Sequence, residues 1–562
     1  MSLKALTLIV LLIFGVSLCL ASEEILPLNQ VEPGMRGFGK TVFSGREIEK
    51  FEFEVLEIMP NFRAKRDLIL VKLLGDKVEH TGVAAGMSGS PVYIDGKLIG
   101  ALAYRFGVFS KEPIAGITPI EQMLEIFERE KVREQELAQK RGFNELYFDV
   151  ATAVREFNLT DFIPPQLQKP KSQDAASNRV TPLEIPLLFS GFENGSMHVP
   201  SEVFSGLGFK VMNYGATFSE GEEVFIEPLE PGSAFSVVIV DGDFGIQATG
   251  TVTYRDGDKI MGFGHPFFDF GAVDLPMGKA KILTTLSSLM ASTKISALTE
   301  VTGTLHQDRS TGVMGVRGES PNMIPVQLTF RSKLQDKTEF SFRIAEDRSL
   351  YSITPLVFSI VLSNALESAR LSRGGQTLQL DGSIKLLGHE PIKLQNYYAG
   401  SGSSTLVTDA SQATGEIAAI LGTILTNNFE APRIEHVELN FEALLKRLSA
   451  TVEKIEVDRT IVRPGEEMNL SVYLREFQGK EHKVQQRIQI PEEVTSRRLA
   501  LYVGSGDRLT KLEVRASPRK FKPQNFSQLV EQLEKRRKNN VLFFQIRERD
   551  KGLLVEGEEL PG

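Results

Sequence analysis

Positions 86–91 read Gly-Met-Ser-Gly-Ser-Pro, and the interpretation of the rest of the chain depends on this stretch. It leads into two apolar runs, 92–94 and 97–104, which are separated only by Asp95 and Gly96. Asp-Gly between apolar runs predicts a two-residue β-hairpin, because a type I′ turn needs positive φ at both central positions. A glycine-rich loop that carries two hydroxyl groups therefore comes directly before a tight hairpin.

The residue types of this loop suit nucleophilic chemistry. Gly86 and Gly89 let the backbone bend sharply and leave room for a carbonyl group to approach Ser88 and its N–H. Backbone N–H groups that converge at such a bend can stabilise an oxyanion. Ser90 is a weaker candidate for the nucleophile. The alternative is a simple Gly/Ser turn, in which Ser88 and Ser90 only cap backbone groups.

The same residues carry a family resemblance. Gly-x-Ser-Gly-x-Pro followed by two short strands resembles the nucleophile segment of chymotrypsin-like serine peptidases. The full hexapeptide, with Gly-Lys-Leu-Ile-Gly-Ala at 96–101, resembles the SpoIVB-type (stage IV sporulation) serine peptidases. The resemblance implies that Ser88 is the nucleophile and that the N–H groups of Gly86 and Ser88 form the oxyanion hole. Met87 stands where the chymotrypsin pattern has an aspartate, so an activating ion pair with a newly cut N-terminus is not available.

A second segment resembles the histidine-bearing part of that family. A strand at 250–254, a polar turn at 256–258 and Gly-Phe-Gly-His at 262–265 imply that His265 is the general base. The alternative is a surface or hydrogen-bonded histidine in a glycine-rich turn. His80 is a second candidate for the base, because it lies close to Ser88 in the sequence.

The order of the two segments departs from the family pattern, in which the histidine segment comes first. The chain resembles a circularly permuted member, in which residues 67–104 match the C-terminal half of the family domain and residues 250–307 its N-terminal half. In a double-barrel peptidase the site lies between two closed barrels, so either order presents the same groups.

The third member of the predicted Ser-His-Asp triad is Asp76. The resemblance implies an aspartate after a strand such as 68–74, where it would orient His265 and stabilise the imidazolium. Asp269 and Asp67 are the other candidates. Equally, Asp76 can be an ordinary turn residue after a strand.

Composition restricts the class of protein. The 562 residues carry a net charge of −8 without a basic face, which argues against a nucleic-acid partner. The apolar run 5–20 after Lys4, with Ala21 before acidic residues, predicts a signal peptide over 1–21 and export to the periplasm or the extracellular space. Cys19, the single cysteine, falls inside it. We expect no disulfide, no metal site and no organic cofactor in the mature chain.

The expected fold is mainly β: a chymotrypsin-like double β-barrel with extra helices and a C-terminal immunoglobulin-like β-sandwich. Thr118, Pro119 and Glu121 predict a capped helix start, and helical spacing over 353–371 and 415–428 predicts core helices too short to span a membrane. The expected segments are a signal peptide (1–21), a nucleophile-bearing barrel (22–128), a helical and Pro-rich linker (129–182), a His-bearing β domain (183–449), the sandwich (450–520) and a helix with a tail (521–562).

These patterns predict an exported serine endopeptidase that acts on protein or peptide substrates. We expect the sandwich to be a spacer or a docking surface for an envelope protein. The competing hypothesis is a non-catalytic envelope protein that keeps the double-barrel scaffold for binding, because a fold does not by itself imply a function. The distance between Ser88 and His265 distinguishes the two.

Overall fold

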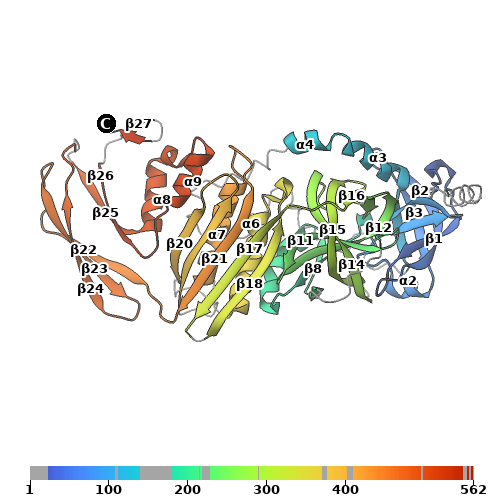
Figure 1. The fold of residues 1–562 in the computed structure, drawn as a ribbon, viewed down its shortest axis with the longest axis horizontal. Coiled ribbons are helices and arrows are strands. Elements are labelled where there is room, and N and C mark those ends of the chain that lie inside the picture. The colour runs from blue at the N-terminus through green and yellow to red at the C-terminus, as the bar shows by residue number, and fades with distance from the viewer. Residues whose placement is uncertain are drawn as a thin grey trace, which may run out of the picture.

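The computed structural model describes most of the chain. The described residues are 23–107, 112–139, 180–213, 216–217, 228–288, 290–333, 335–369, 376–400, 409–494, 498–548, 553–555 and 558–560. The predicted signal peptide, with Cys19, and residues 140–179 of the predicted linker lie outside these residues. Along the longest axis follow a first barrel, a second barrel, a sheet with two helices, and a smaller C-terminal part (Figure 1).

Six strands of the N-terminal part close into a barrel. Their order is β4-β1-β2-β3-β6-β5, and β5 pairs with β4 to close the ring. The strands are β1 (Arg36–Thr41), β2 (Glu49–Arg63), β3 (Arg66–Leu74), β4 (Pro91–Ile94), β5 (Lys97–Phe106) and β6 (Ile114–Pro119), with the short helices η1 (Leu28–Gln30) and α2 (Asp76–Thr81) and the added strand β7 (Val180–Pro182). Alternation along β2 turns Phe51, Phe53 and Val55 into the barrel core.

The predicted hairpin is present and organises the first barrel. Asp95 and Gly96 join β4 to β5 with φ values of 49° and 79°, the positive values that a type I′ turn requires. The loop that carries Ser88 enters β4 directly, so the hairpin fixes the position where that loop ends.

A second six-stranded barrel follows. The order β11-β14-β15-β16-β13-β12 closes through the pairing of β12 with β11. The strands are β11 (Ala234–Gly242), β12 (Gly245–Asp256), β13 (Lys259–Gly262), β14 (Gly271–Leu286), β15 (Thr293–Arg309) and β16 (Gly312–Arg317). The expectation of a mainly β, double-barrel fold with extra helices is therefore confirmed.

The second barrel continues into a larger sheet. β18 pairs with β11, and the sheet then runs β17, β21, β19 and β20, while β8 and β9 extend it beyond β12. The bounds are β8 (Ile185–Ser190), η5 (Asn194–Met197), α5 (His198–Gly206), β9 (Phe209–Met212), β10 (Ala216–Thr217), β17 (Met323–Ser332), β18 (Gln335–Ala345), η6 (Arg348–Leu350), α6 (Thr354–Ser368), β19 (Thr377–Leu386), β20 (Ile392–Ala399), α7 (Asp409–Leu425) and β21 (Ile434–Leu444). The core helices expected from apolar spacing are α6 and α7, which share one apolar core with the second barrel. Among the described residues, no helix is long and apolar enough to cross a membrane.

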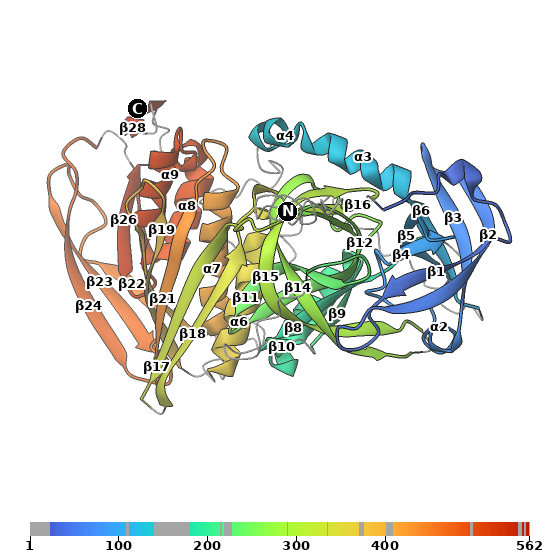
Figure 2. The same cartoon turned by 45° about the vertical axis from the view of Figure 1, so that its right-hand side comes forward.

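Helices α3 (Ile120–Glu130) and α4 (Arg133–Gln139) extend from the first barrel over the second (Figure 2). The expected capping box is not formed: Pro119 is the N-cap, and the Thr118 hydroxyl donates instead to the carbonyl oxygen of Gly264 in the second barrel. Thr118 lies in β6 with its hydroxyl directed across the barrel interface, so it cannot turn back to the helix start. A threonine expected to begin a helix therefore joins the two barrels.

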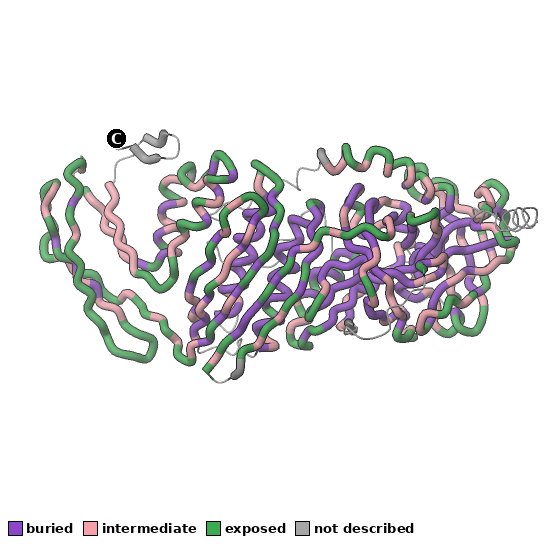
Figure 3. Tube along the Cα trace, viewed as in Figure 1, coloured by how far each residue is buried: buried purple, intermediate pink, exposed green. Residues whose placement is uncertain are grey.

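The C-terminal part differs from the expected immunoglobulin-like sandwich over 450–520. A sandwich of that type needs about seven strands in two facing sheets, whereas these residues form a three-stranded sheet β22-β23-β24 and a separate pair β25-β26. β24 is almost wholly exposed, so among the described residues little packs on either face of this strand (Figure 3). The elements are β22 (Ala450–Val457), β23 (Glu467–Glu476), β24 (Glu481–Gln489), β25 (Leu499–Ser505), α8 (Gly506–Ala516), η7 (Pro518–Phe521), α9 (Phe526–Glu534), β26 (Leu542–Glu548), β27 (Leu553–Val555) and β28 (Glu558–Leu560).

Candidate active site

The Ser88 loop lies at the contact between the two barrels. Gly86 and Gly89 both have φ of +92°, a conformation that L side chains rarely adopt. A Cβ atom on Gly89 would lie 2.0 Å from the carbonyl oxygen of Thr251 in the second barrel. Glycine at this position therefore allows the serine loop to approach the second barrel closely enough for chemistry between them.

The His265 loop joins β13 to β14 and faces the first barrel. Phe263 and Gly264 have φ of 64° and 66°, which turns the chain sharply after β13. A Cβ atom on Gly264 would lie 3.0 Å from the Cβ of Ala103 in β5, and the Gly264 carbonyl accepts a 2.6 Å hydrogen bond from Thr118 Oγ1. Small residues and one cross-barrel hydrogen bond thus seat the histidine loop on the first barrel.

The structure brings Ser88 and His265, which are 177 residues apart in the sequence, into direct contact. Ser88 Oγ contacts His265 Nε2 at hydrogen-bond distance and also donates a 2.7 Å hydrogen bond to the carbonyl oxygen of Phe263. His265 Nδ1 lies 2.9 Å from the carbonyl oxygen of Pro266. A carbonyl oxygen only accepts, so Nδ1 carries a ring proton. The Ser88 hydroxyl group has one proton, which reaches either the Phe263 carbonyl oxygen or, after rotation about the Cβ–Oγ bond, Nε2 of the neutral ring.

The predicted oxyanion donors are placed beside this pair. Gly86 and Ser88 are buried, and within the described part of the chain their N–H groups donate to no acceptor of the protein. Most buried N–H groups in proteins have a partner. The N–H groups of Gly86 and Ser88 have no acceptor in the described part of the protein, so a substrate oxyanion could accept hydrogen bonds from both.

The other predicted site residues lie elsewhere. Asp76 is exposed in the first turn of α2, whereas His265 is buried. His80 is exposed near the end of the same helix, and Asp269 is exposed after the histidine loop. Asp67 accepts a hydrogen bond from the N–H of Asn61, on the far side of its barrel strand. Ser90 is buried and donates to the Met87 carbonyl oxygen at 2.6 Å.

A residue that the sequence analysis missed supports the histidine loop. Asp308, near the end of β15, is fully buried and accepts hydrogen bonds from the N–H groups of Phe267, Phe268 and Phe270 at 2.7, 2.7 and 3.2 Å. Burial raises the pKa of Asp308 to about 6, although the three N–H groups act in the opposite direction. The only hint in the sequence is an acidic residue at the end of a strand with an apolar pattern, just before the turn at Gly312.

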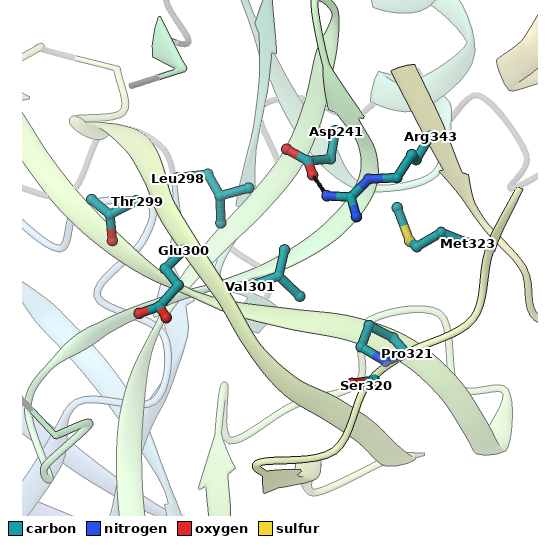
Figure 4. A pocket seen from close by; sticks show the side chains of 9 residues that line it. All are labelled: Asp241, Leu298, Thr299, Glu300, Val301, Ser320, Pro321, Met323 and Arg343. Carbon is teal, nitrogen blue, oxygen red and sulfur yellow. Dashed lines mark hydrogen bonds and ion pairs between the residues drawn. The ribbon is translucent and has the colours of Figure 1, made fainter. Parts of the chain in front are cut away.

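Ser88 and His265 are both buried in this conformation. Ser88 and His265 have 0% and 1% of their surface exposed. A cavity of about 420 Å³ lies instead among β11, β15, β18 and the segment before β17, where Asp241 and Arg343 form an ion pair (Figure 4). Access of a substrate to Ser88 therefore requires some of the residues that cover it to move.

No group of three or more histidine, cysteine, aspartate or glutamate side chains that suits a metal ion occurs among the described residues.

Comparison with known proteins identifies the first barrel. Residues 22–124 match the family model of the SpoIVB peptidase S55 family, so this part of the chain is similar to the SpoIVB type, as the pattern around Ser88 predicted. The match covers less than one fifth of the chain and includes Ser88 but not His265. No curated protein and no solved structure matches the chain.

Proposed function

We propose that this protein is a serine endopeptidase that cleaves protein or peptide substrates with Ser88 as the nucleophile and His265 as the general base. The observation that carries the proposal is the hydrogen bond between Ser88 Oγ and His265 Nε2, which joins two loops from different barrels. The peptidase family match of residues 22–124 supports the same reaction class.

The geometry suits acyl transfer. Nε2 of His265 takes the Ser88 proton as Oγ attacks the scissile carbonyl carbon, and the carbonyl oxygen becomes an oxyanion. The N–H groups of Gly86 and Ser88 stabilise that charge. The imidazolium then gives its proton to the leaving amine, and a water molecule hydrolyses the acyl-enzyme by the same steps in reverse.

In this mechanism the carbonyl oxygen of Pro266 takes the orienting role that we had assigned to Asp76. It holds the Nδ1 proton and so fixes the tautomer, which is the first task of the aspartate in a triad. A neutral carbonyl stabilises the imidazolium less than a carboxylate does, since it carries no net charge. We propose that this backbone contact contributes to the orientation of His265.

The serine-bearing barrel precedes the histidine-bearing barrel, and we propose that the chain is a circularly permuted relative of the SpoIVB type.

We also propose that residues 1–21 direct export to the periplasm or the extracellular space and that the C-terminal sheets dock an envelope protein. Cell fractionation, with and without residues 1–21, tests the predicted export. Loss of co-purifying envelope protein after removal of β22–β24 would support the docking role, and an unchanged set would contradict it.

The proposal is tested by labelling the purified protein with a fluorophosphonate probe, which reacts with activated serines. We expect labelling at Ser88, no labelling of Ser88→Ala, and a loss of at least about 10³-fold in His265→Ala, because each group is needed for proton transfer. Ser359→Ala is the matched control, since Ser359 is equally buried but lies in α6.

The other outcomes are equally informative. Labelling that persists in His265→Ala would exclude His265 as the base. A folded wild-type protein without any labelling would contradict the peptidase and favour the non-catalytic scaffold.

A further inference from the structure

Lys294 is a wholly buried lysine beside the Ser88 loop. It lies at the start of β15 in the second barrel, with 0% of its surface exposed. Its carbon chain packs on Gly86, where a Cβ atom would lie only 3.1 Å from the Lys294 Cβ. Burial lowers the pKa of its ammonium group to about 7. A buried lysine destabilises a fold unless its polar group has partners, so its contacts deserve a functional explanation.

A chain of hydrogen bonds runs from Lys294 to the backbone of the nucleophile loop. Lys294 Nζ donates to Thr41 Oγ1 at 2.6 Å, Thr41 Oγ1 lies 3.1 Å from Ser90 Oγ, and Ser90 Oγ lies 2.6 Å from the Met87 carbonyl oxygen. A hydroxyl group carries one proton. Ser90 Oγ is the donor both to Thr41 Oγ1 and to the Met87 carbonyl oxygen, so its single proton is shared between them. Thr41, which Lys294 Nζ holds in place, therefore fixes the position of the Ser90 hydroxyl group beside Met87.

The last hydrogen bond of this network, at the Met87 carbonyl oxygen, affects the orientation of the Ser88 N–H, which is one of the two proposed oxyanion donors. The carbonyl of Met87 and the N–H of Ser88 belong to the same planar trans peptide group and point in opposite directions. A hydrogen bond to the carbonyl therefore fixes the direction of the N–H.

The main chain of Lys294 controls the other donor in the same way. Its N–H donates to the Ala85 carbonyl oxygen at 3.0 Å, and the Ala85 N–H donates to the Ser292 carbonyl oxygen at 2.8 Å. The Ala85 carbonyl shares its peptide group with the Gly86 N–H. One residue of the second barrel thus holds both peptide groups of the proposed hole.

We propose that Lys294 is the positioning residue of the oxyanion hole, which it orients through its own N–H on the Gly86 side and through Thr41 and Ser90 on the Ser88 side. This inference rests on the proposed peptidase function. Both barrels then contribute to the oxyanion hole. The N–H donors of Gly86 and Ser88 lie in the first barrel, and Lys294, which orients them, lies in the second.

The test compares the rates at which the purified full-length variants react with a fluorophosphonate, whose phosphoryl oxygen occupies the oxyanion hole. Lys294→Met keeps the chain length and removes the ammonium group. We expect the limiting labelling rate constant at Ser88 to fall about 10- to 100-fold, with the half-saturating probe concentration nearly unchanged, because the hole is disordered but present.

A matched pair at position 41 separates hydrogen bonding from packing. Thr41→Val keeps the shape and removes the hydroxyl, and we expect it to lower the rate constant by a similar factor. Thr41→Ser keeps the hydroxyl and should retain a rate within about threefold of the wild type. Ser90→Ala combined with Lys294→Met should lose no more than the stronger single variant, because both act through one chain.

Each failure has a different meaning. A folded wild type without labelling would overturn the peptidase proposal and this inference with it. Labelling of the wild type and of Lys294→Met at equal rates would overturn the inference alone, as would equal rates for Thr41→Val and Thr41→Ser. If Lys294→Met fails to fold by circular dichroism, the Thr41 pair decides.

Discussion

At the scale of single residues, the backbone and one buried carboxylate hold the imidazole of His265. Pro266 contacts Nδ1 through its carbonyl oxygen, and Asp308 holds the three N–H groups of the loop that follows. The ring therefore depends on the conformation of residues 266–270. A change at Asp308 reaches His265 without touching the ring.

Asp308→Ala leaves three backbone N–H groups of the histidine loop without their acceptor. Each unsatisfied buried donor costs roughly 1–3 kcal/mol, so we expect unfolding to become easier by on the order of 3 kcal/mol after local relaxation. We also expect fluorophosphonate labelling to slow by about tenfold or more, measured at a temperature where the variant is folded.

The matched control is Asp243→Ala. Asp243 also accepts a backbone N–H, from Ser341 at 2.6 Å, but it is exposed in the turn between β11 and β12. We expect the fluorophosphonate to label Ser88 in Asp243→Ala at the same rate as in the wild type. Equal losses in the two variants would show that Asp308 has no special relation to His265.

Ser88 and His265 were predictable from the sequence because each lies in a short glycine-containing motif that is recognisable by itself. Asp308 and Lys294 were not, because nothing near them in the sequence distinguishes them from ordinary strand residues. Their importance comes from what β15 brings next to them after folding. Asp76 was predicted from the family pattern of an aspartate after a strand and before the nucleophile loop, and it stays a prediction. The carbonyl oxygen of Pro266 beside Nδ1 is a contact that no side-chain pattern reveals.

At the scale of elements, α3 and α4 attach the first barrel to the strand end that supports the histidine loop. Glu130 of α3 accepts hydrogen bonds from His306 Nδ1 and Gln307 Nε2 at 2.7 and 2.8 Å, and Arg309 pairs with Glu136 of α4. His306, Gln307 and Arg309 flank Asp308 on β15. The helices therefore connect the serine barrel to the residue that positions His265.

His306 makes this connection sensitive to pH. Burial and Arg133 lower its pKa, but the hydrogen bonds to Glu130 and Glu319 outweigh them and raise it above the ordinary value of 6.5. A raised pKa means that the folded state holds the proton more tightly than the unfolded state. The stabilisation is complete below pH 6.5 and is lost as the pH rises through the folded-state pKa.

We therefore expect the melting temperature of the wild type, relative to that of His306→Gln, to fall as the pH is raised above 6.5. Glutamine keeps a hydrogen-bonding side chain but cannot take the proton, so the variant lacks this part of the pH dependence. Calorimetric melting curves of both proteins across neutral pH measure the difference. A difference that stays constant with pH would contradict a titrating role for His306.

Local sequence patterns also predicted several elements correctly, and the failures have physical causes. Asp95 and Gly96 specify their turn by backbone preference alone, and the apolar spacing in α6 and α7 reports burial directly. The alternation in β23 also reports burial, on one face only. Such a pattern does not reveal whether a second sheet or helices cover that face, so the sandwich could not be distinguished from the observed small sheets.

At the scale of the whole molecule, the protein has two main apolar cores. One fills the first barrel, and the other runs without interruption from the second barrel through α6 and α7 to α9. A smaller cluster, which includes Ile120, Met123 and Met261, lies between the barrels. The catalytic pair is therefore placed where two separately stabilised bodies meet.

Two matched cavity variants test this division. Ile420→Ala in α7 and Leu73→Ala in β3 each remove a buried aliphatic side chain and should cost about 3 kcal/mol. We expect Ile420→Ala to lower amide-exchange protection throughout the second barrel and α6, while the core strands of the first barrel keep theirs. Leu73→Ala should do the reverse. Loss of protection in both barrels in either variant would show a single cooperative unit.

Because Ser88 and Lys294 lie in different barrels, they are synthesised at different times during translation. Ser88 leaves the ribosome 177 residues before His265, and Lys294 follows later still. At about 5–20 residues per second, the first barrel can fold and wait roughly 10–30 s without a base or a supported hole. A nascent chain with only its serine barrel would therefore be harmless to the proteins around it, and full synthesis itself would be the step that arms the enzyme.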